Sequence, residues 1–115
     1  MKKRTIRICG REWKFILDPK TPGGLYKTYG NTGQGELHLG TKWDEGDWPM
    51  ALLLHEIMEA ICTVDNKRWR DPEGGDVNED RVIFVFDHAY SMDLAHKIVD
   101  SLKSVGIKPS LKDIE

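Results

Sequence analysis

The feature that most constrains this chain is a nearly continuous apolar segment at 50–63, MALLLHEIMEAICT. Wound as an α-helix, this segment would carry apolar side chains around almost its whole circumference, so we expect a helix buried in the core. Asp47 precedes it as the expected N-cap. The segment also holds His55, Glu56 and Glu59. Because charged groups inside a core need partners or a metal ion, these three residues are the first candidates for a functional site.

The sequence before this segment predicts a small sheet. Two alternating segments, 5–9 and 13–17, predict a β-hairpin with Gly10-Arg11 as its two-residue turn. A further short strand is expected at 36–39, whereas residues 25–33 fit no element clearly.

The sequence after the apolar segment predicts a loop, a strand and a second helix. Residues 64–80 are polar and contain glycines, which is typical of an exposed loop. The continuous apolar run at 82–86 is typical of a central strand covered on both faces. Asp87 is the expected N-cap of a helix over 88–103, and Gly106 is its expected terminator.

The length of 115 residues suits one compact domain, so residues 1–115 are expected to form a single domain. The order of elements predicts an α+β fold. We expect a small, mostly antiparallel sheet of about three to four strands, packed with two main helices.

Charge and cysteine content limit the partners and the compartment. The formal net charge of -2 gives no global basic field, so nucleic-acid binding is not favoured. No apolar run approaches the ~20 residues of a membrane helix, and the basic start of the chain lacks the apolar stretch of a signal peptide. The two cysteines, Cys9 and Cys62, lack C-x-x-C spacing and indicate a reducing compartment. We therefore expect a soluble cytoplasmic protein with no membrane partner.

The spacing of His55 and Glu59 predicts a pair of metal ligands. Positions i and i+4 lie about 40° apart on one helix face and about 6 Å apart along the axis, so two side chains so spaced can hold one ion. This is how the two histidines of an H-E-x-x-H helix bind zinc. Glu56 lies about 100° round the helix from His55, where a carboxylate can act on a metal-activated water as general base.

A catalytic zinc site uses three protein ligands and a water, so a third ligand is needed. His88 is the best candidate, because it begins the second predicted helix on the face that carries Met92, Ala95, Val99 and Leu102. By periodicity this should be the core face, and a histidine at its start would point toward the first helix.

Simpler interpretations stay open for these and other polar residues. His55 and Glu59 could form an internal hydrogen-bonded pair at a helix edge, with Glu56 solvated. His38 alternates with two leucines, so it is expected to face solvent, with a cleft beside the metal as the alternative. Cys62 is expected to be a small buried hydrophobe.

The stretches LLLHEIMEAI at 52–61 and VIFVFDHAYSMDLAHKIVDSL at 82–102 resemble the small zincin-like metallopeptidase domains encoded by phages and prophages. Those domains are similar in general plan to ImmA/IrrE-type and SprT-like metallopeptidase cores. The resemblance implies a minimal zincin-like fold that binds one zinc ion per chain. It assigns His55, Glu59 and His88 as the metal ligands and Glu56 as the general base, although Glu59 stands where the better-known pattern has a second histidine.

The function expected from these residues is zinc-dependent hydrolysis of a peptide or amide bond by a metal-activated water, with a peptide or protein as substrate. An alternative from another class is a non-catalytic phage protein that keeps the metal for stability and binds a host protein. For a phage-encoded chain, the compartment would be the cytoplasm of the bacterial host.

Overall fold

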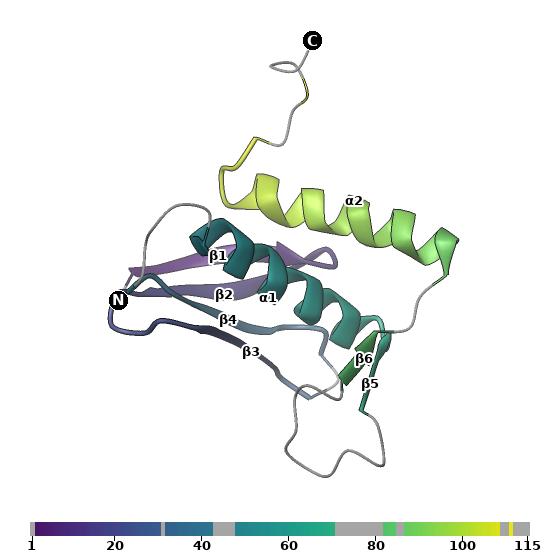
Figure 1. Ribbon diagram of the computed structural model, residues 1–115, viewed down its shortest axis with the longest axis horizontal. Helices are drawn as coiled ribbons and strands as arrows, with labels where there is room; N and C mark the ends of the chain where they lie inside the picture. Colours follow the sequence, from purple (N-terminus) through teal and green to yellow (C-terminus); the bar gives the residue numbers. More distant parts are fainter. Residues whose placement is uncertain are drawn as a thin grey trace.

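The computed structural model describes residues 2–30, 32–42, 48–70, 82–84, 87–108 and 111. Figure 1 shows the arrangement of the elements in space. In chain order they are β1 (Lys2–Ile8), β2 (Arg11–Asp18), β3 (Gly24–Thr28), β4 (Gly35–Gly40), α1 (Trp48–Val64), β5 (Arg68–Arg70), β6 (Val82–Phe84) and α2 (His88–Ser104).

The predicted N-terminal hairpin is present, with its turn one residue earlier than expected. β1 pairs antiparallel with β2, and Ile8 lies opposite Arg11. The two turn residues are therefore Cys9 and Gly10, with φ of 50° and 78°. A two-residue hairpin turn that matches the twist of its strands needs positive φ at both positions, so the single glycine occupies the second one.

The hairpin belongs to a four-stranded mixed sheet in the order β1-β2-β4-β3. β2 and β4 are parallel, whereas the β1–β2 and β3–β4 pairs are antiparallel. The prediction of an α+β fold with a small, mostly antiparallel sheet is confirmed. The sequence did not reveal β3, which begins at Gly24, extends into the segment left unassigned at 25–33 and forms an edge of the sheet.

Both helices lie on the same side of the sheet, with α1 across it and α2 beside α1 and β1 (Figure 1). Alternate residues of the strands point toward the helices, and Trp13 also donates its indole N–H to the Gly33 carbonyl at 3.0 Å. The core comprises Ile6, Ile8, Trp13, Phe15, Leu37, Leu39, Leu52, Leu53, Ile57, Ala60, Ile61, Cys62, Leu94 and Leu102. Cys62 is fully buried, as predicted.

The expectation that α1 is buried on all sides is wrong. Met50 and Leu54 are 43% and 38% exposed, and His55 is also exposed. The sheet covers one side of α1 and α2 covers part of another, so the side that carries Met50, Leu54 and His55 faces solvent. The expected N-cap, Asp47, lies outside the described residues.

The strand predicted at 82–86 is present at 82–84, but it does not lie at the centre of the sheet. Among the described residues, β6 pairs with β5 alone, antiparallel, in a separate two-stranded sheet. The pairing places Trp69 opposite Ile83. The predicted loop at 64–80 therefore contains a strand at its beginning, and residues 71–81 and 85–86 lie outside the described part of the chain.

α2 begins and ends as predicted, but its inner face differs. Asp87 is the N-cap, since its carboxylate accepts a hydrogen bond from the Tyr90 backbone N–H at 2.8 Å. Gly106, with φ of 89°, follows the last turn. Met92, expected to face the core, is 57% exposed. The buried residues of α2 are Leu94, Ser101 and Leu102.

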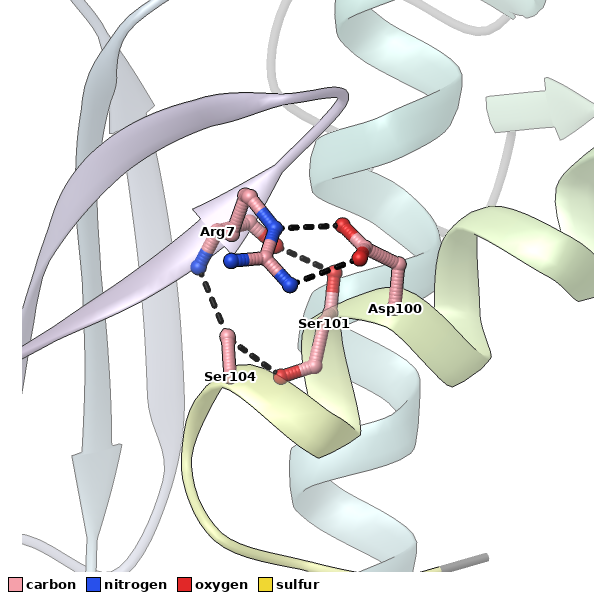
Figure 2. Close-up of polar contacts among 4 residues, drawn as sticks. All are labelled: Arg7, Asp100, Ser101 and Ser104. Atoms are coloured by element: carbon pink, nitrogen blue, oxygen red, sulfur yellow. Dashed lines mark hydrogen bonds and ion pairs between the residues drawn. The ribbon is translucent and has the colours of Figure 1, made fainter.

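Polar contacts with the edge strand β1 explain why α2 presents a different face to the core than the one predicted (Figure 2). The Ser101 hydroxyl donates to the Arg7 carbonyl at 2.6 Å, and the Arg7 backbone N–H donates to the Ser104 hydroxyl at 2.9 Å. The Arg7 guanidinium binds both carboxylate oxygens of Asp100, at 2.8 and 2.7 Å. Polar residues therefore line the face of α2 that packs on β1, and an analysis of hydrophobic periodicity does not detect such a face. Their hydroxyls satisfy the backbone N–H and carbonyl of Arg7 at this edge of the sheet. No described helix is long and apolar enough to cross a membrane.

Candidate metal centre

Three side chains of α1, His55, Glu56 and Glu59, form a group that could hold a metal ion, and we call it the His-Glu-Glu group. One ligand atom from each lies within 4.8 Å of the others. The His55 Nε2 atom is 3.1 Å from Glu59 Oε2 and 4.0 Å from Glu56 Oε1. The i, i+4 spacing on one helix face produces the closer pair, as the sequence predicted.

The three side chains of this group differ in exposure. The side chain of His55 is 56% exposed, that of Glu59 is 17% exposed, and that of Glu56 is 6% exposed. The group is therefore open to solvent at the imidazole and closed at the Glu56 carboxylate. A ligand arriving from solvent would meet His55 and Glu59 before Glu56.

Gly24 of β3 makes room for the buried carboxylate. A Cβ atom at position 24 would lie 2.8 Å from Glu56 Cγ and 3.1 Å from Glu56 Cδ. It would also lie 3.1 Å from the His38 backbone oxygen, so there is little space in which to move. The 2.8 Å contact is shorter than real Cβ contacts and the other two are tight, so a side chain at position 24 would displace Glu56, and glycine lets Glu56 pack directly against the sheet.

Hydrogen bonds fix α1 against β3 one turn beyond the group. The Thr63 hydroxyl donates to the Glu59 backbone carbonyl at 2.8 Å. Since that hydroxyl proton is used, the Tyr26 hydroxyl donates to Thr63 Oγ1, also at 2.8 Å. Tyr26 and Gly24 are both residues of β3, so this strand positions both the helix and its buried carboxylate.

The structure does not bring His88 to the other predicted site residues. His88 is exposed at the start of α2, so its predicted inward orientation is wrong. The neighbouring Tyr90 hydroxyl donates to Asp65 at 2.7 Å. Asp65 follows His55 by ten residues, which corresponds to roughly 15 Å along a helix axis. This end of α2 therefore packs near the C-terminal end of α1, away from the His-Glu-Glu group.

The simpler interpretation was a hydrogen-bonded pair of His55 and Glu59 beside a solvated Glu56. The structure supports it for the pair and contradicts it for Glu56. His55 and Glu59 do lie within hydrogen-bond distance of each other on the helix surface. Glu56, expected in that interpretation to be solvated, is instead buried. A surface pair alone therefore does not describe the group, because one of its two carboxylates is buried.

The remaining histidine of interest, His38, lies on the opposite face of the sheet. Leu37 and Leu39 are buried on the helix side, so His38 alternates away from the helices. Its side chain is 30% exposed, and Nε2 lies 3.5 Å from Glu36 Oε1. The sheet separates His38 from the His-Glu-Glu group, which excludes the alternative of a cleft beside the metal.

The donor set of the group suits a divalent metal. An imidazole nitrogen and two carboxylate oxygens are ligands that zinc accepts, as do several other first-row metals.

Comparison of the chain with family models, with curated proteins and with solved structures gives no match. The contribution of β3 to this site was missed from the sequence, and its one signal was the Gly23-Gly24 pair, which predicts only a turn.

Proposed function

We propose that this protein is a metal-dependent hydrolase that cleaves a peptide or amide bond, with His55 and Glu59 as two of the ligands of a zinc ion and with Glu56 as the general base. The observation that supports this most strongly is the convergence of an imidazole and two carboxylates within 4.8 Å, one of the carboxylates being buried. A buried carboxylate next to an exposed metal-binding pair is an arrangement suited to proton transfer.

The two carboxylates differ in ways that suit different roles. Glu59 is close to His55 and shares its helix face, so the two side chains would bind the same ion. Glu56 lies farther from the imidazole, and its side chain is held against Gly24. A bound zinc ion would supply a Lewis acid that polarises the substrate carbonyl and acidifies water. Glu56 would accept the proton of the attacking water and later return it to the leaving amine.

The position of β3 favours an extended peptide as substrate. β3 is an edge strand, and among the described residues its outer side pairs with no other strand. The opposite edge, β1, is occupied by Ser101 and Ser104 of α2. A peptide added along β3 would gain main-chain hydrogen bonds next to the His-Glu-Glu group.

The first test is zinc content per chain, measured by elemental analysis after metal-free purification and reloading. We expect about one zinc in the wild type, and loss of zinc in His55→Ala and Glu59→Gln, because each variant removes a ligand. His88→Ala is the matched control, since it removes an exposed histidine outside the group and should leave the zinc bound. A wild-type protein that takes up no zinc, or a zinc site that survives His55→Ala, would contradict the proposal.

The second test separates metal binding from chemistry with Glu56→Gln. This variant should keep its zinc and lose the hydrolysis of a mixture of unstructured peptides, followed by mass spectrometry, by at least about a hundredfold. Zinc binding with equal hydrolysis in wild type and variant would exclude Glu56 as the base.

The exposed apolar residues of α1 support a second candidate, a metal-stabilised protein that binds another protein. Met50 and Leu54 are spaced i, i+4 on the solvent side of the helix that carries the group. This candidate requires that zinc raises the melting temperature of the wild type, that Glu56→Gln has no effect, and that no peptide is cleaved.

A further inference from the structure

In the described part of the chain, β3 forms the edge of the sheet that α2 leaves uncovered (Figure 1). At the end of its pairing with β4, the Tyr29 N–H donates to the Gln34 carbonyl at 2.9 Å. Since alternate residues of an antiparallel pair bond to each other, the odd-numbered residues of β3 turn their backbone groups toward β4. The even-numbered residues turn theirs toward the outer side of β3. A strand added there would pass Gly24, against which the buried Glu56 packs.

Two rows of side chains cross the face of the sheet that points away from the helices, and both end at β3. The rows are Lys14–Glu36–Lys27 and Ile16–His38–Leu25, each read from β2 through β4 to β3. The outermost member of each row is exposed, since the side chain of Lys27 is 59% exposed and Leu25 is 51% exposed. The outer ends of the rows are therefore accessible to a strand that pairs with β3.

The first row alternates in charge and ends in a cation. Glu36 Oε2 is 3.1 Å from Lys27 Nζ, and Lys14 lies opposite Glu36 on the other side. The ammonium group of Lys27 has further N–H donors beyond the one used in this contact. A carboxylate opposite Lys27 on an added strand would continue the alternation, because opposite charges across a strand pair are stabilising and like charges are destabilising.

The second row ends in an apolar side chain. Ile16, at its inner end, is only 6% exposed, whereas half of Leu25 faces solvent. An apolar side chain opposite Leu25 would remove part of this surface from water. If the added strand is antiparallel, the positions opposite Leu25 and Lys27 are the pairs without mutual hydrogen bonds, at which facing side chains come closest. Contacts at these two positions would therefore select the sequence of the strand.

We propose that β3 binds an extended peptide that carries an acidic residue two positions before an apolar residue, as an added antiparallel strand. Antiparallel pairing is the more stable per residue, and it places the partner of Lys27 two positions before the partner of Leu25. As a substrate class this rests on the proposed hydrolysis, but the binding itself needs no reaction. A second copy of β3 would not supply the carboxylate, because the strand GLYKT contains no acidic residue.

The experiment measures peptide binding by fluorescence anisotropy, with zinc-loaded Glu56→Gln as the protein so that the probe is not cleaved. The probes are dye-labelled Ser-Thr-Glu-Thr-Leu-Thr-Ser and two versions of it, with Lys in place of Glu or Ser in place of Leu. We expect the first probe to bind about fivefold or more tightly than the Lys version, and more tightly than the Ser version.

Variants of β3 in this protein locate the preference. Lys27→Gln should remove the preference for Glu over Lys, because the amide can still donate to Glu36 but carries no charge, and Lys27→Glu should reverse it. Leu25→Ser should remove only the preference for Leu over Ser. Thr28→Pro should weaken the binding of every probe, because it removes an N–H that points to the outer side, where a proline is tolerated. Lys103→Gln, an exposed lysine on α2, is the matched charge control and should change nothing.

Melting temperatures show whether each variant is folded. The proposal is overturned if no probe binds saturably, if the preference for Glu over Lys survives Lys27→Gln, or if Lys103→Gln removes it. A dimer in light scattering that Thr28→Pro converts to a monomer would also overturn it, because a second copy would then occupy β3. Failure of the hydrolysis leaves these binding results unchanged, and loss of the preference leaves zinc-dependent cleavage by the wild type unchanged, so the two failures are distinguishable.

Discussion

At the scale of single residues, the position of Cys9 in the hairpin turn determines the surroundings of its thiol. The hairpin holds Cys9 at a positive φ of 50°, which L residues adopt at some cost. Its sulfur lies 3.9 Å from Asp65 Oδ1, just beyond α1. Burial, and then the negative charge of Asp65, raise the pKa of the Cys9 thiol to about 12. The thiolate, which is the reactive form, is therefore disfavoured in the folded protein.

This pKa predicts that Cys9 is unreactive at pH 8. A rise from the ordinary value of 9.0 to about 12 lowers the thiolate fraction by roughly a thousandfold. Cys62→Ala isolates the Cys9 thiol, and its rate of alkylation by iodoacetamide would be followed by mass spectrometry. The same variant in urea gives the rate for an ordinary thiol. Equal rates in the folded and unfolded protein would contradict the proposed environment.

At the scale of elements, the docking of α2 on β1 depends on one buried hydroxyl. Ser101 is fully buried and donates to the carbonyl of Arg7. Ser101→Ala would leave this carbonyl without its partner, so we expect a loss of about 1–2 kcal/mol in the free energy of unfolding. The Arg7–Asp100 pair should contribute less, because both side chains are 44% exposed and water screens their charges.

Urea denaturation followed by circular dichroism measures this loss. Ser91→Ala is the matched control on the same helix, because in the described part of the chain the Ser91 hydroxyl donates to the His88 carbonyl within the first turn and to no other group. It should change the unfolding free energy by less than about 0.5 kcal/mol. If the two alanine variants are equally stable, the hydroxyl of Ser101 does not hold α2 on the strand.

At the scale of the whole molecule, Glu36 makes stability depend on pH. Hydrogen bonds from Tyr29 and then from Lys27 lower the pKa of Glu36 from 4.5 to about 2 in the folded protein. A group with a lowered folded pKa stabilises the fold above its unfolded pKa, and this contribution is lost as pH falls from about 4.5 toward about 2. The urea concentration at the midpoint of unfolding should therefore be lower at pH 3 than at pH 7 in the wild type.

The midpoint should fall less in Glu36→Gln, which has no carboxylate to protonate at this position. Some acid sensitivity should remain, because hydrogen bonds from Lys20 and Arg7 lower the pKa values of Asp18 and Asp100 respectively. Glu12→Gln, which changes an exposed residue of β2, should behave as wild type. The same pH dependence in all three proteins would exclude a role for Glu36.

Local patterns in the sequence were sufficient for several features. The hairpin, the strand at 36–39, the two helices and the N-cap Asp87 all depend on residues near one another in the chain. The approach of His55 to Glu59 was equally predictable, because the geometry of one helix determines it. The exact turn residues were not, since they depend on the register of the two strands.

Features that depend on distant residues were predicted poorly. β3 carries few apolar residues, and its pairing with β4 defines it more than its own pattern does. The strand at 82–84 was assigned to the wrong sheet because an apolar run does not specify its partner. His88 was placed on an inner face by hydrophobic periodicity, whereas Ser101 and Ser104 orient α2.

The sequence by itself therefore determined the fold class, the helix that carries the candidate site and the pair of side chains spaced to bind a metal. Only the tertiary structure decided that Glu56 is buried against Gly24 and that His88 is exposed. The physical reason is the distance along the chain over which each interaction acts. Helical spacing and turn chemistry act over a few residues, whereas burial and charge balance depend on which strands and helices the whole chain brings together.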